Sequence, residues 1–374
     1  MARRHVELCR RFGDASVTMD VSTVRADGAE EFDAGEPNRI NRQPFYFSQA
    51  KLFTNQLRWT KWLLSSAQSD LRVIHCGNVR PVGYAVTLAN LRRRTPFLLY
   101  VNGSDLLREQ MALSDARKRF GAKTIFGAAS GIVATSAWVG RLAEELIRDL
   151  DIRKAPPIGA FYLGTDPIFF HPNRDTGALR AKWGIGTDPL LVTVARLVPH
   201  KGQDVTLRAM AALTEEFPAL RYAIVGTGPD EGRLRALAGE LKISDRTIFT
   251  GAVSDDEIAE AYATSTIYSG LSRVESVIFA EGFGISFLEA AASGVPSIAG
   301  DSGGVRSAVR DGISGIVLPP TDVRRVTGAI RDLLREPEKR AAMGSRARSL
   351  VETHYNWDRV ARDTRLFTDQ TIKL

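Results

Sequence analysis

The chain has 374 residues, a length that favours two domains, and its 44% hydrophobic and 25% charged residues are typical of a globular protein. No apolar run reaches the 18 residues of a membrane-spanning helix, and the opening MARRHVELCRRFGD lacks the apolar core of a signal peptide. Because two cysteines exclude a disulfide scaffold and a cysteine zinc site, we expect a cytoplasmic protein.

The positive charge is confined to the first half of the chain. Residues 1–150 contain 22 Lys and Arg against 15 Asp and Glu, whereas the remaining residues contain 28 of each. Single clusters such as residues 92–94 and 117–119 are typical of solvated helix faces, but the half as a whole favours an anionic substrate or surface. We expect no nucleic acid as partner, because no zinc-finger spacing, ribonucleoprotein motif or helix-turn-helix signal is present.

Short β-type runs alternate with helical stretches from the first residues onward. A helix is predicted over ARRHVELCRRFG, residues 2–13, and the alternation that follows predicts parallel sheets covered by helices. In the first half, strands are predicted at residues 16–24, 71–77, 95–103 and 131–136. In the second half they are predicted at residues 189–197, 220–226, 247–251, 265–271, 295–300 and 315–319.

A break in this rhythm separates the two halves. Residues 153–189 are rich in Pro and Gly, and we place the domain boundary near residues 165–188. The expected fold class is α/β with two Rossmann-like domains. Their predicted ranges are residues 1–168 and residues 169–352, followed by a C-terminal helix over residues 353–374.

The strand PLLVTVARL ends in Arg196, and the turn VPHKG that follows carries Lys201. Open α/β sheets bind ligands at the C-terminal ends of their strands, so these two cations are candidates to bind a diphosphate. The alternative is a pair of surface ion pairs with Asp204 or Asp230, and the residues alone leave both interpretations open. The next turn, Gly226–Pro229, does not complete a dinucleotide fingerprint and is equally typical of a tight strand-to-helix turn.

The stretch EGFGISFLEAAASG carries the most informative pattern. Gly282 and Gly284 resist helix formation, so we predict that Glu281 lies in a loop and that a helix begins near Ile285. Glu289 then lies on the side of that helix, among apolar neighbours that predict burial. A buried carboxylate without a partner is costly, and the hydroxyl groups of a ligand would satisfy it. The backbone N–H groups at the helix start favour an anion or sugar hydroxyls.

The Gly-rich turn in DSGGVRSAVRDG follows the next strand and by itself is typical of an ordinary turn. Taken together, however, five stretches resemble the family 4 retaining glycosyltransferases, which have the GT-B fold, and the resemblance covers the second half almost completely. In chain order they are VARLVPHKG, AIVGTGPDEGRL, IFTGAVSDDEI, EGFGISFLEAAASGVPSIA and SGGVRSAVRDGISGIVLPP.

The resemblance implies roles for named residues. Glu281 and Glu289 match the family's paired glutamates, which implies that Glu289 holds the ribose of a nucleotide sugar. It also implies that Glu281 holds the donor sugar, together with the backbone of Phe283, Gly284 and Ile285. Arg196 and Lys201 would bind the diphosphate, and residues from Gly251 to Val253 would lie beside the base. No metal or other cofactor is implied, because the two cations supply the positive charge.

The first half departs from the family in two respects. In YVNGSDLL many relatives carry a histidine at the position of Asn102. An amide can hydrogen-bond a sugar hydroxyl but cannot take up a proton as imidazole can. Relatives also begin with a strand and a Gly-rich loop that this sequence lacks, which predicts an unpaired gap in the first sheet. We hypothesise an assigned start codon that is too late, or a degenerate copy. An intact mass from the native host that matches residues 1–374 would exclude the late start.

The sequence therefore predicts a sugar-nucleotide-dependent retaining glycosyltransferase that acts on an acceptor hydroxyl in polysaccharide or glycolipid synthesis. The acceptor is expected on the basic first half, which predicts an anionic lipid or saccharide and peripheral contact at the inner face of the membrane. Two alternatives stay open. One is a catalytically degenerate protein that only binds a nucleotide sugar, and the other is a different GT-B activity such as sugar-nucleotide epimerisation.

Overall fold

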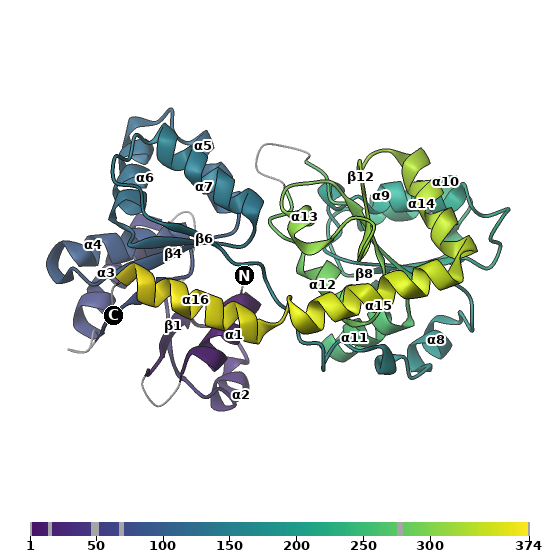
Figure 1. Cartoon of the computed structure of the whole chain (residues 1–374), viewed down its shortest axis with the longest axis horizontal. Coiled ribbons are helices and arrows are strands. Elements are labelled where there is room, and N and C mark those ends of the chain that lie inside the picture. The colour runs from purple at the N-terminus through teal and green to yellow at the C-terminus, as the bar shows by residue number, and fades with distance from the viewer. Residues whose placement is uncertain (1, 14–16, 46–51, 67–70, 275–279, 373–374) are drawn as a thin grey trace. The chain divides into compact units, whose positions relative to one another are not determined.

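The computed structural model describes residues 2–13, 17–45, 52–66, 71–274 and 280–372. Its residue contacts divide the chain into two units, which are described separately (Figure 1). Unit 1 comprises Met1–Phe161 and Trp357–Leu374, and unit 2 comprises Tyr162–Asn356.

These unit boundaries differ from the predicted domain ranges at both ends of the second domain. The first boundary lies between Phe161 and Tyr162 rather than after residue 168. Strand β6 (Ile158–Ala160), inside the Pro- and Gly-rich segment, completes the sheet of unit 1, and the unit ends directly after this strand. The predicted C-terminal helix is present as α16 (Trp357–Ile372) and belongs to unit 1. Its Phe367 ring packs edge-on against Phe161, with ring centroids 5.4 Å apart.

Unit 2 is built on a six-stranded parallel sheet, and each of its predicted strands is confirmed. The strands are β7 (Leu190–Val194), β8 (Arg221–Val225), β9 (Thr247–Gly251), β10 (Ile267–Gly270), β11 (Ser297–Gly300) and β12 (Gly315–Leu318). The α-helices are α8 (Ala178–Trp183), α9 (Gln203–Ala211), α10 (Glu231–Glu240), α11 (Asp255–Thr264), α12 (Ile285–Ala292), α13 (Val305–Ala308), α14 (Val323–Arg335) and α15 (Pro337–Thr353). Short 3₁₀ turns are η3 (Pro172–Arg174), η4 (Pro199–Lys201) and η5 (Ser244–Arg246).

The strand order of this sheet, β12-β11-β10-β7-β8-β9, locates the site. The chain moves outward in one direction from β7 through β8 to β9, and then returns to β10 on the other side of β7. Connections therefore leave β7 and β10 toward opposite sides, which opens a crevice at the C-terminal ends of these two strands. Open α/β sheets bind their ligands at such a switch point.

Among the described residues, the sheet of unit 1 is interrupted. Strands β3 (Ile74–Cys76), β4 (Phe97–Val101), β5 (Gly131–Ala134) and β6 form a four-stranded parallel sheet. Strands β1 (Asp20–Val24) and β2 (Arg39–Gln43) form a separate parallel pair instead of continuing it. The sequence reading missed β2 and β6: RINRQ is mostly polar, and the three-residue IGA follows two prolines.

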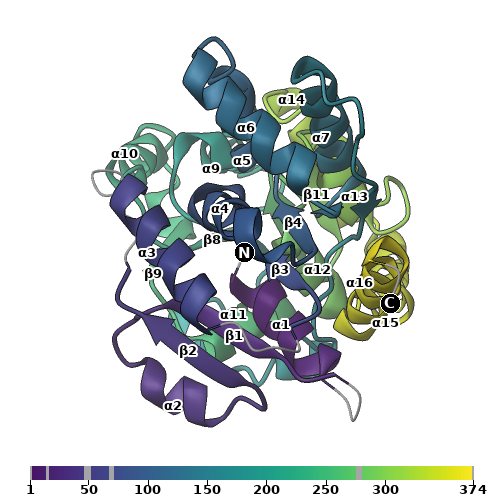
Figure 2. The same cartoon turned by 90° about the vertical axis from the view of Figure 1, so that its left-hand side faces the viewer.

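Helices of unit 1 cover these sheets. They are α1 (Ala2–Phe12), α2 (Ala29–Ala34), α3 (Leu52–Ser66), α4 (Tyr84–Arg93), α5 (Ser104–Met111), α6 (Ala116–Ala128), α7 (Ala137–Asp149) and α16, with a π-helical turn η2 (Val79–Gly83). In Figure 2, α3, α4 and α6 lie on the side of unit 1 that faces the viewer. Contacts join α3 to α4 and α4 to α6, so the three form one layer.

Helix α1 brings a buried cation onto the four-stranded sheet. Arg4 is 2% exposed, and its guanidinium lies over the Tyr100 ring at 4.6 Å from the centroid. Among the described residues none accepts a hydrogen bond from its three guanidinium nitrogens. Burial therefore lowers the pKa of Arg4 to about 10, although Tyr100 and Asp105 act in the opposite direction.

Candidate functional site

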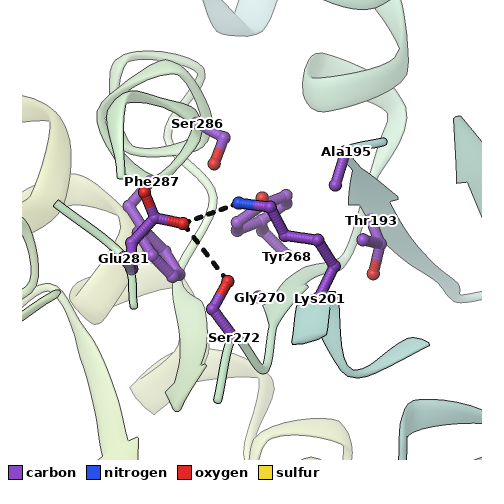
Figure 3. Close-up of a pocket in the computed structure, with 9 residues that line it drawn as sticks. All are labelled: Thr193, Ala195, Lys201, Tyr268, Gly270, Ser272, Glu281, Ser286 and Phe287. Carbon is purple, nitrogen blue, oxygen red and sulfur yellow. Dashed lines mark hydrogen bonds and ion pairs between the residues drawn. The ribbon is translucent and has the colours of Figure 1, made fainter. Parts of the chain in front are cut away.

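A polar pocket lies at the switch point between β7 and β10 (Figure 3). The ends of these strands form its floor, and the turn after β7 and the start of α12 form its walls. Its lining residues are Thr193, Ala195, Lys201, Tyr268, Gly270, Ser272, Glu281, Ser286 and Phe287. Two residues predicted from the sequence, Lys201 and Glu281, are therefore neighbours in space although 80 positions separate them.

Lys201 and Glu281 form an ion pair at the pocket. The Lys201 ammonium donates a hydrogen bond of 2.7 Å to Glu281 Oε2, and the Ser272 hydroxyl donates one of 3.2 Å to the same oxygen. The two paired side chains are only 24% and 18% exposed. Burial by itself raises the pKa of Glu281, but Lys201, with Ser272, brings that pKa below its ordinary value.

A glycine places Lys201 at this point. Gly202 follows it with φ +73°, and a β-carbon there would lie 2.1 Å from the carbonyl oxygen of Leu271, at the end of β10. Any other residue would push the turn away from that strand, because the clash is with backbone. The glycine therefore fixes the distance between the turn after β7 and the segment after β10.

The ion-pair alternative for the two cations fails among the described residues. Asp204 pairs with Arg273 at 2.9 Å and Asp230 pairs with Arg233 at 2.6 Å, so neither carboxylate holds Lys201. Arg196 is exposed directly after β7 and forms no ion pair with a carboxylate of the described ranges. The pocket thus carries one cation, Lys201, paired with a glutamate, whereas Arg196 faces solvent at the end of β7 and is not among the lining residues.

The prediction for the start of α12 is confirmed. Glu281 lies outside any helix, and α12 begins at Ile285 after Gly284, whose φ is +93°. The N–H groups of the first turn of a helix have no acceptor within the helix, so they are available to a ligand. Phe283 is 3% exposed and packs against aromatic rings of unit 2, which anchors the loop between the two glutamates.

The Gly-rich turn after β11 supports the same loop. The Gly304 N–H donates a hydrogen bond of 2.7 Å to the carbonyl oxygen of Glu281. Gly303, with φ +58°, lies so close that a β-carbon would stand 2.3 Å from that oxygen. The turn that looks ordinary in the sequence therefore positions the backbone of Glu281.

Glu289 is buried in α12, as predicted, but it has a protein partner. Glu289 is only 8% exposed. The Tyr262 hydroxyl of α11 donates a hydrogen bond of 2.9 Å to Glu289 Oε2. Tyr262 therefore already satisfies this oxygen, and the role of ligand hydroxyl groups at Glu289 stays a prediction. Tyr262 and Ser272 were both missed from the sequence, because a tyrosine in a helix and a serine after a strand carry no distinctive spacing.

The other predicted residues lie at two separate places. Gly251 ends β9, its carbonyl oxygen accepts a hydrogen bond of 3.1 Å from the Gly226 N–H, and Val253 follows two residues later. This puts both residues at the C-terminal edge of the same sheet. Asn102 follows β4 in unit 1, and its side-chain Nδ2 is buried with no hydrogen-bond partner among the described residues.

Among the described residues, no three His, Cys, Asp or Glu side chains are grouped closely enough to hold a metal ion. Nor does any helix of these ranges have the length and apolar character needed to cross a membrane.

Comparison with known proteins gives relatives mainly for the second half. Residues 175–350 match the family described as "Glycosyl transferases group 1". A GDP-mannose-dependent alpha-(1-6)-phosphatidylinositol monomannoside mannosyltransferase of Mycolicibacterium smegmatis is 37% identical over 196 residues, which are 52% of this chain and 51% of the relative. A D-inositol 3-phosphate glycosyltransferase of Streptomyces bingchenggensis is 32% identical over 261 residues, 67% of this chain and 54% of the relative. The chain spans about half the length of such relatives.

Solved structures resemble the whole chain. HepE of Anabaena, in complex with UDP and glucose, matches with a TM-score of 0.79 and 17% identity over 98% of this chain and 95% of that one. Sucrose-phosphate synthase of Thermosynechococcus elongatus matches with a TM-score of 0.75 and 22% identity over 97% and 91%. At these identities the likeness shows the fold alone.

Proposed function

We propose a sugar-nucleotide-dependent glycosyltransferase, on the premise that residues 175–350 belong to the glycosyl transferases group 1 family and that the chain has the GT-B fold. The retaining mechanism and membership of family 4 are part of this proposal. The observation that carries it is the Lys201–Glu281 pair at the switch point of the sheet, beside the exposed Arg196.

The pair supports a specific order of events at the donor site. A diphosphate carries more negative charge than a carboxylate, so it competes with Glu281 for the Lys201 ammonium. When Lys201 turns to the diphosphate, the Glu281 carboxylate is released to accept hydrogen bonds from the donor sugar. Arg196 and the first-turn N–H groups of α12 add to the positive field. Glu289, held by Tyr262, is proposed to accept hydrogen bonds from the ribose.

The same groups serve the chemical step. As the bond between the sugar and the diphosphate breaks, negative charge grows on the leaving phosphate, and Arg196 and Lys201 stabilise it there. The acceptor hydroxyl oxygen then bonds to the anomeric carbon from the face that the leaving group vacates and gives its proton to the departing phosphate oxygen, so the configuration is retained. Because two cations already neutralise the diphosphate, we propose that no metal ion is needed.

The relatives suggest the first substrates to test. The name of the mannosyltransferase specifies GDP-mannose as donor and a phosphatidylinositol mannoside as acceptor, and the name of the other relative specifies inositol phosphate as acceptor. Both acceptors are anionic, which agrees with the net positive charge of residues 1–150. We therefore propose transfer of a hexose from a nucleotide sugar to an anionic lipid or saccharide acceptor, at the inner face of the membrane. The basic first half makes the peripheral contact.

A catalytically degenerate protein that binds a nucleotide sugar is the second candidate, and sugar-nucleotide epimerisation is another GT-B activity to test. The interrupted sheet of unit 1 and the amide at Asn102 favour the degenerate protein. The complete set of Arg196, Lys201, Glu281 and Glu289 favours catalysis. The glycosyltransferase and the degenerate protein differ in one outcome, because both bind a nucleotide sugar and only the enzyme transfers the sugar.

Thermal unfolding in a panel of nucleoside diphosphates and sugar nucleotides tests the proposal. A ligand at a hundred times its dissociation constant adds about 2.7 kcal/mol to stability. We expect nucleotides of one base to raise the melting temperature. This rise should be lost in Glu289→Ala and Arg196→Ala and kept in the control Arg208→Ala, which removes an exposed arginine of α9. Incubation with the matched sugar nucleotide and acceptor then detects transfer. No stabilisation by any ligand would contradict the proposal.

A further inference from the structure

The helix layer of α3, α4 and α6 on unit 1 has an unusual outer surface. These three helices carry eight Lys and Arg residues and no Asp or Glu. All eight cations are exposed: Arg58, Lys61, Arg92, Arg93, Arg117, Lys118, Arg119 and Lys123. Two other helices of unit 1 differ from this layer. Helix α7 mixes two arginines with three acidic residues. Of the four arginines of α1, Arg4 is buried, and Arg10 and Arg11 form ion pairs with carboxylates.

Large apolar side chains stand among these cations. Leu91 is 77% exposed, Phe120 is 73% exposed and Phe53 is 71% exposed. Leu57 and Leu88 are also exposed, and Phe53 lies four residues before Leu57, so both are on one face of α3. Exposed side chains of this size cost little singly, but their gathering on one layer indicates an interaction surface.

We propose that this layer docks flat on a bilayer of anionic phospholipids. Cations attract the anionic head groups while leucine and phenylalanine side chains enter the boundary with the acyl chains, which is how amphipathic surfaces bind membranes. A nucleic acid would match the charge but would leave the apolar side chains without a partner. An acidic protein surface would do the same at the positions of Leu91 and Phe120.

This inference deepens the proposed action on an anionic lipid acceptor and rests on it for its biological purpose. It explains how a protein without a membrane-spanning helix among its described residues would reach an acceptor in the bilayer. The docking itself needs no donor and no catalysis, so it is measured separately from transfer.

Sedimentation with vesicles tests the docking, using the full chain at low salt and no nucleotide. Phosphatidylcholine vesicles are compared with vesicles that also contain phosphatidylglycerol. Each cation near an anionic bilayer contributes about fivefold to the partition coefficient. The triple variant Arg58→Ser/Lys61→Ser/Arg92→Ser should therefore bind about a hundredfold more weakly. The matched control Arg141→Ser/Arg208→Ser/Arg324→Ser removes as many exposed cations from α7, α9 and α14 and should bind like the parent.

The apolar contribution has its own pair of variants. Phe53→Ser/Leu91→Ser should weaken binding by at least about tenfold, because each side chain leaves water in the docked state. The control Ile168→Ser/Leu366→Ser alters two other exposed apolar side chains and should have no effect. Equal binding to neutral and anionic vesicles would overturn the proposal. So would equal losses in both triple variants, or unchanged binding of Phe53→Ser/Leu91→Ser to anionic vesicles, which would show that charge alone acts and would favour a soluble polyanion.

Discussion

Replacing Lys201 by methionine separates the structural role of the ion pair from its role in binding. Methionine keeps most of the side-chain volume. It leaves the Glu281 carboxylate, 18% exposed, with the Ser272 hydroxyl as its one side-chain hydrogen-bond donor among the described residues. Breaking a fully buried pair costs roughly 3–5 kcal/mol and an exposed one less than about 1 kcal/mol. For this half-buried pair we expect a loss of about 2 kcal/mol. In a unit of this size that loss lowers the melting temperature by about 4–8 °C.

The pH dependence of this loss follows from the pKa of Glu281. Its folded-state pKa lies below the ordinary 4.5, so the pair stabilises the protein above that pH and the stabilisation disappears as pH falls through the folded value. The difference in stability between the parent and Lys201→Met should therefore be largest at neutral pH and become smaller in acid. The double variant Lys201→Met/Glu281→Gln, which removes the unpaired charge, should recover most of the lost stability.

Scanning calorimetry of the full chain at neutral and acidic pH measures these differences. Lys339→Met is the matched control, because Lys339 pairs with Glu336 at 3.1 Å while both side chains are about half exposed. It should change the melting temperature very little. An equal loss at both pH values, or no recovery in the double variant, would refute the reasoning.

Three further outcomes are expected from the structure. Tyr262→Phe removes a hydrogen-bond donor from Glu289 and should cost about 1–2 kcal/mol of stability. It should also weaken the binding of ribonucleotides more than that of 2′-deoxyribonucleotides, measured by calorimetric titration. Equal weakening of both would contradict a role at the ribose. Arg4→Met should stabilise the protein by up to about 3 kcal/mol, the cost that a pKa of about 10 implies, measured by urea unfolding. A destabilised variant would show that the guanidinium has an acceptor. Gly202→Ala should cost about 3 kcal/mol or more, because its β-carbon meets the Leu271 carbonyl; an unchanged melting temperature would contradict that contact.

The second half could be predicted closely because its local signals agree with its tertiary structure. Strands β7 to β12 are short apolar runs between turn residues, and the glycines before Ile285 correctly place the helix start. The same logic places Lys201 and Glu281 at one edge of a sheet. Their direct pairing could not be predicted, because it depends on which strand lies beside β7, and strand order is a long-range property.

The errors in the first half have physical causes as well. β2 is polar because it lies in a two-stranded sheet with little core to cover, so it lacks an alternating apolar pattern. β6 was read as linker because Pro and Gly around it mark turns, although three residues suffice to extend a buried parallel sheet. Tyr262 and Ser272 act through contacts with residues far away in the sequence, which no local pattern encodes.

Calorimetric titration of the sugar nucleotide selected by the panel tests the central claim most directly. It is carried out on the parent, on Lys201→Met/Glu281→Gln and on the control Lys339→Met. If the crevice between β7 and β10 binds the donor diphosphate, the parent and Lys339→Met bind alike. The double variant, stable and folded, then binds at least about tenfold more weakly, since one charge-assisted hydrogen bond is worth about 1.5–3 kcal/mol. Equal affinities in all three proteins would contradict the account.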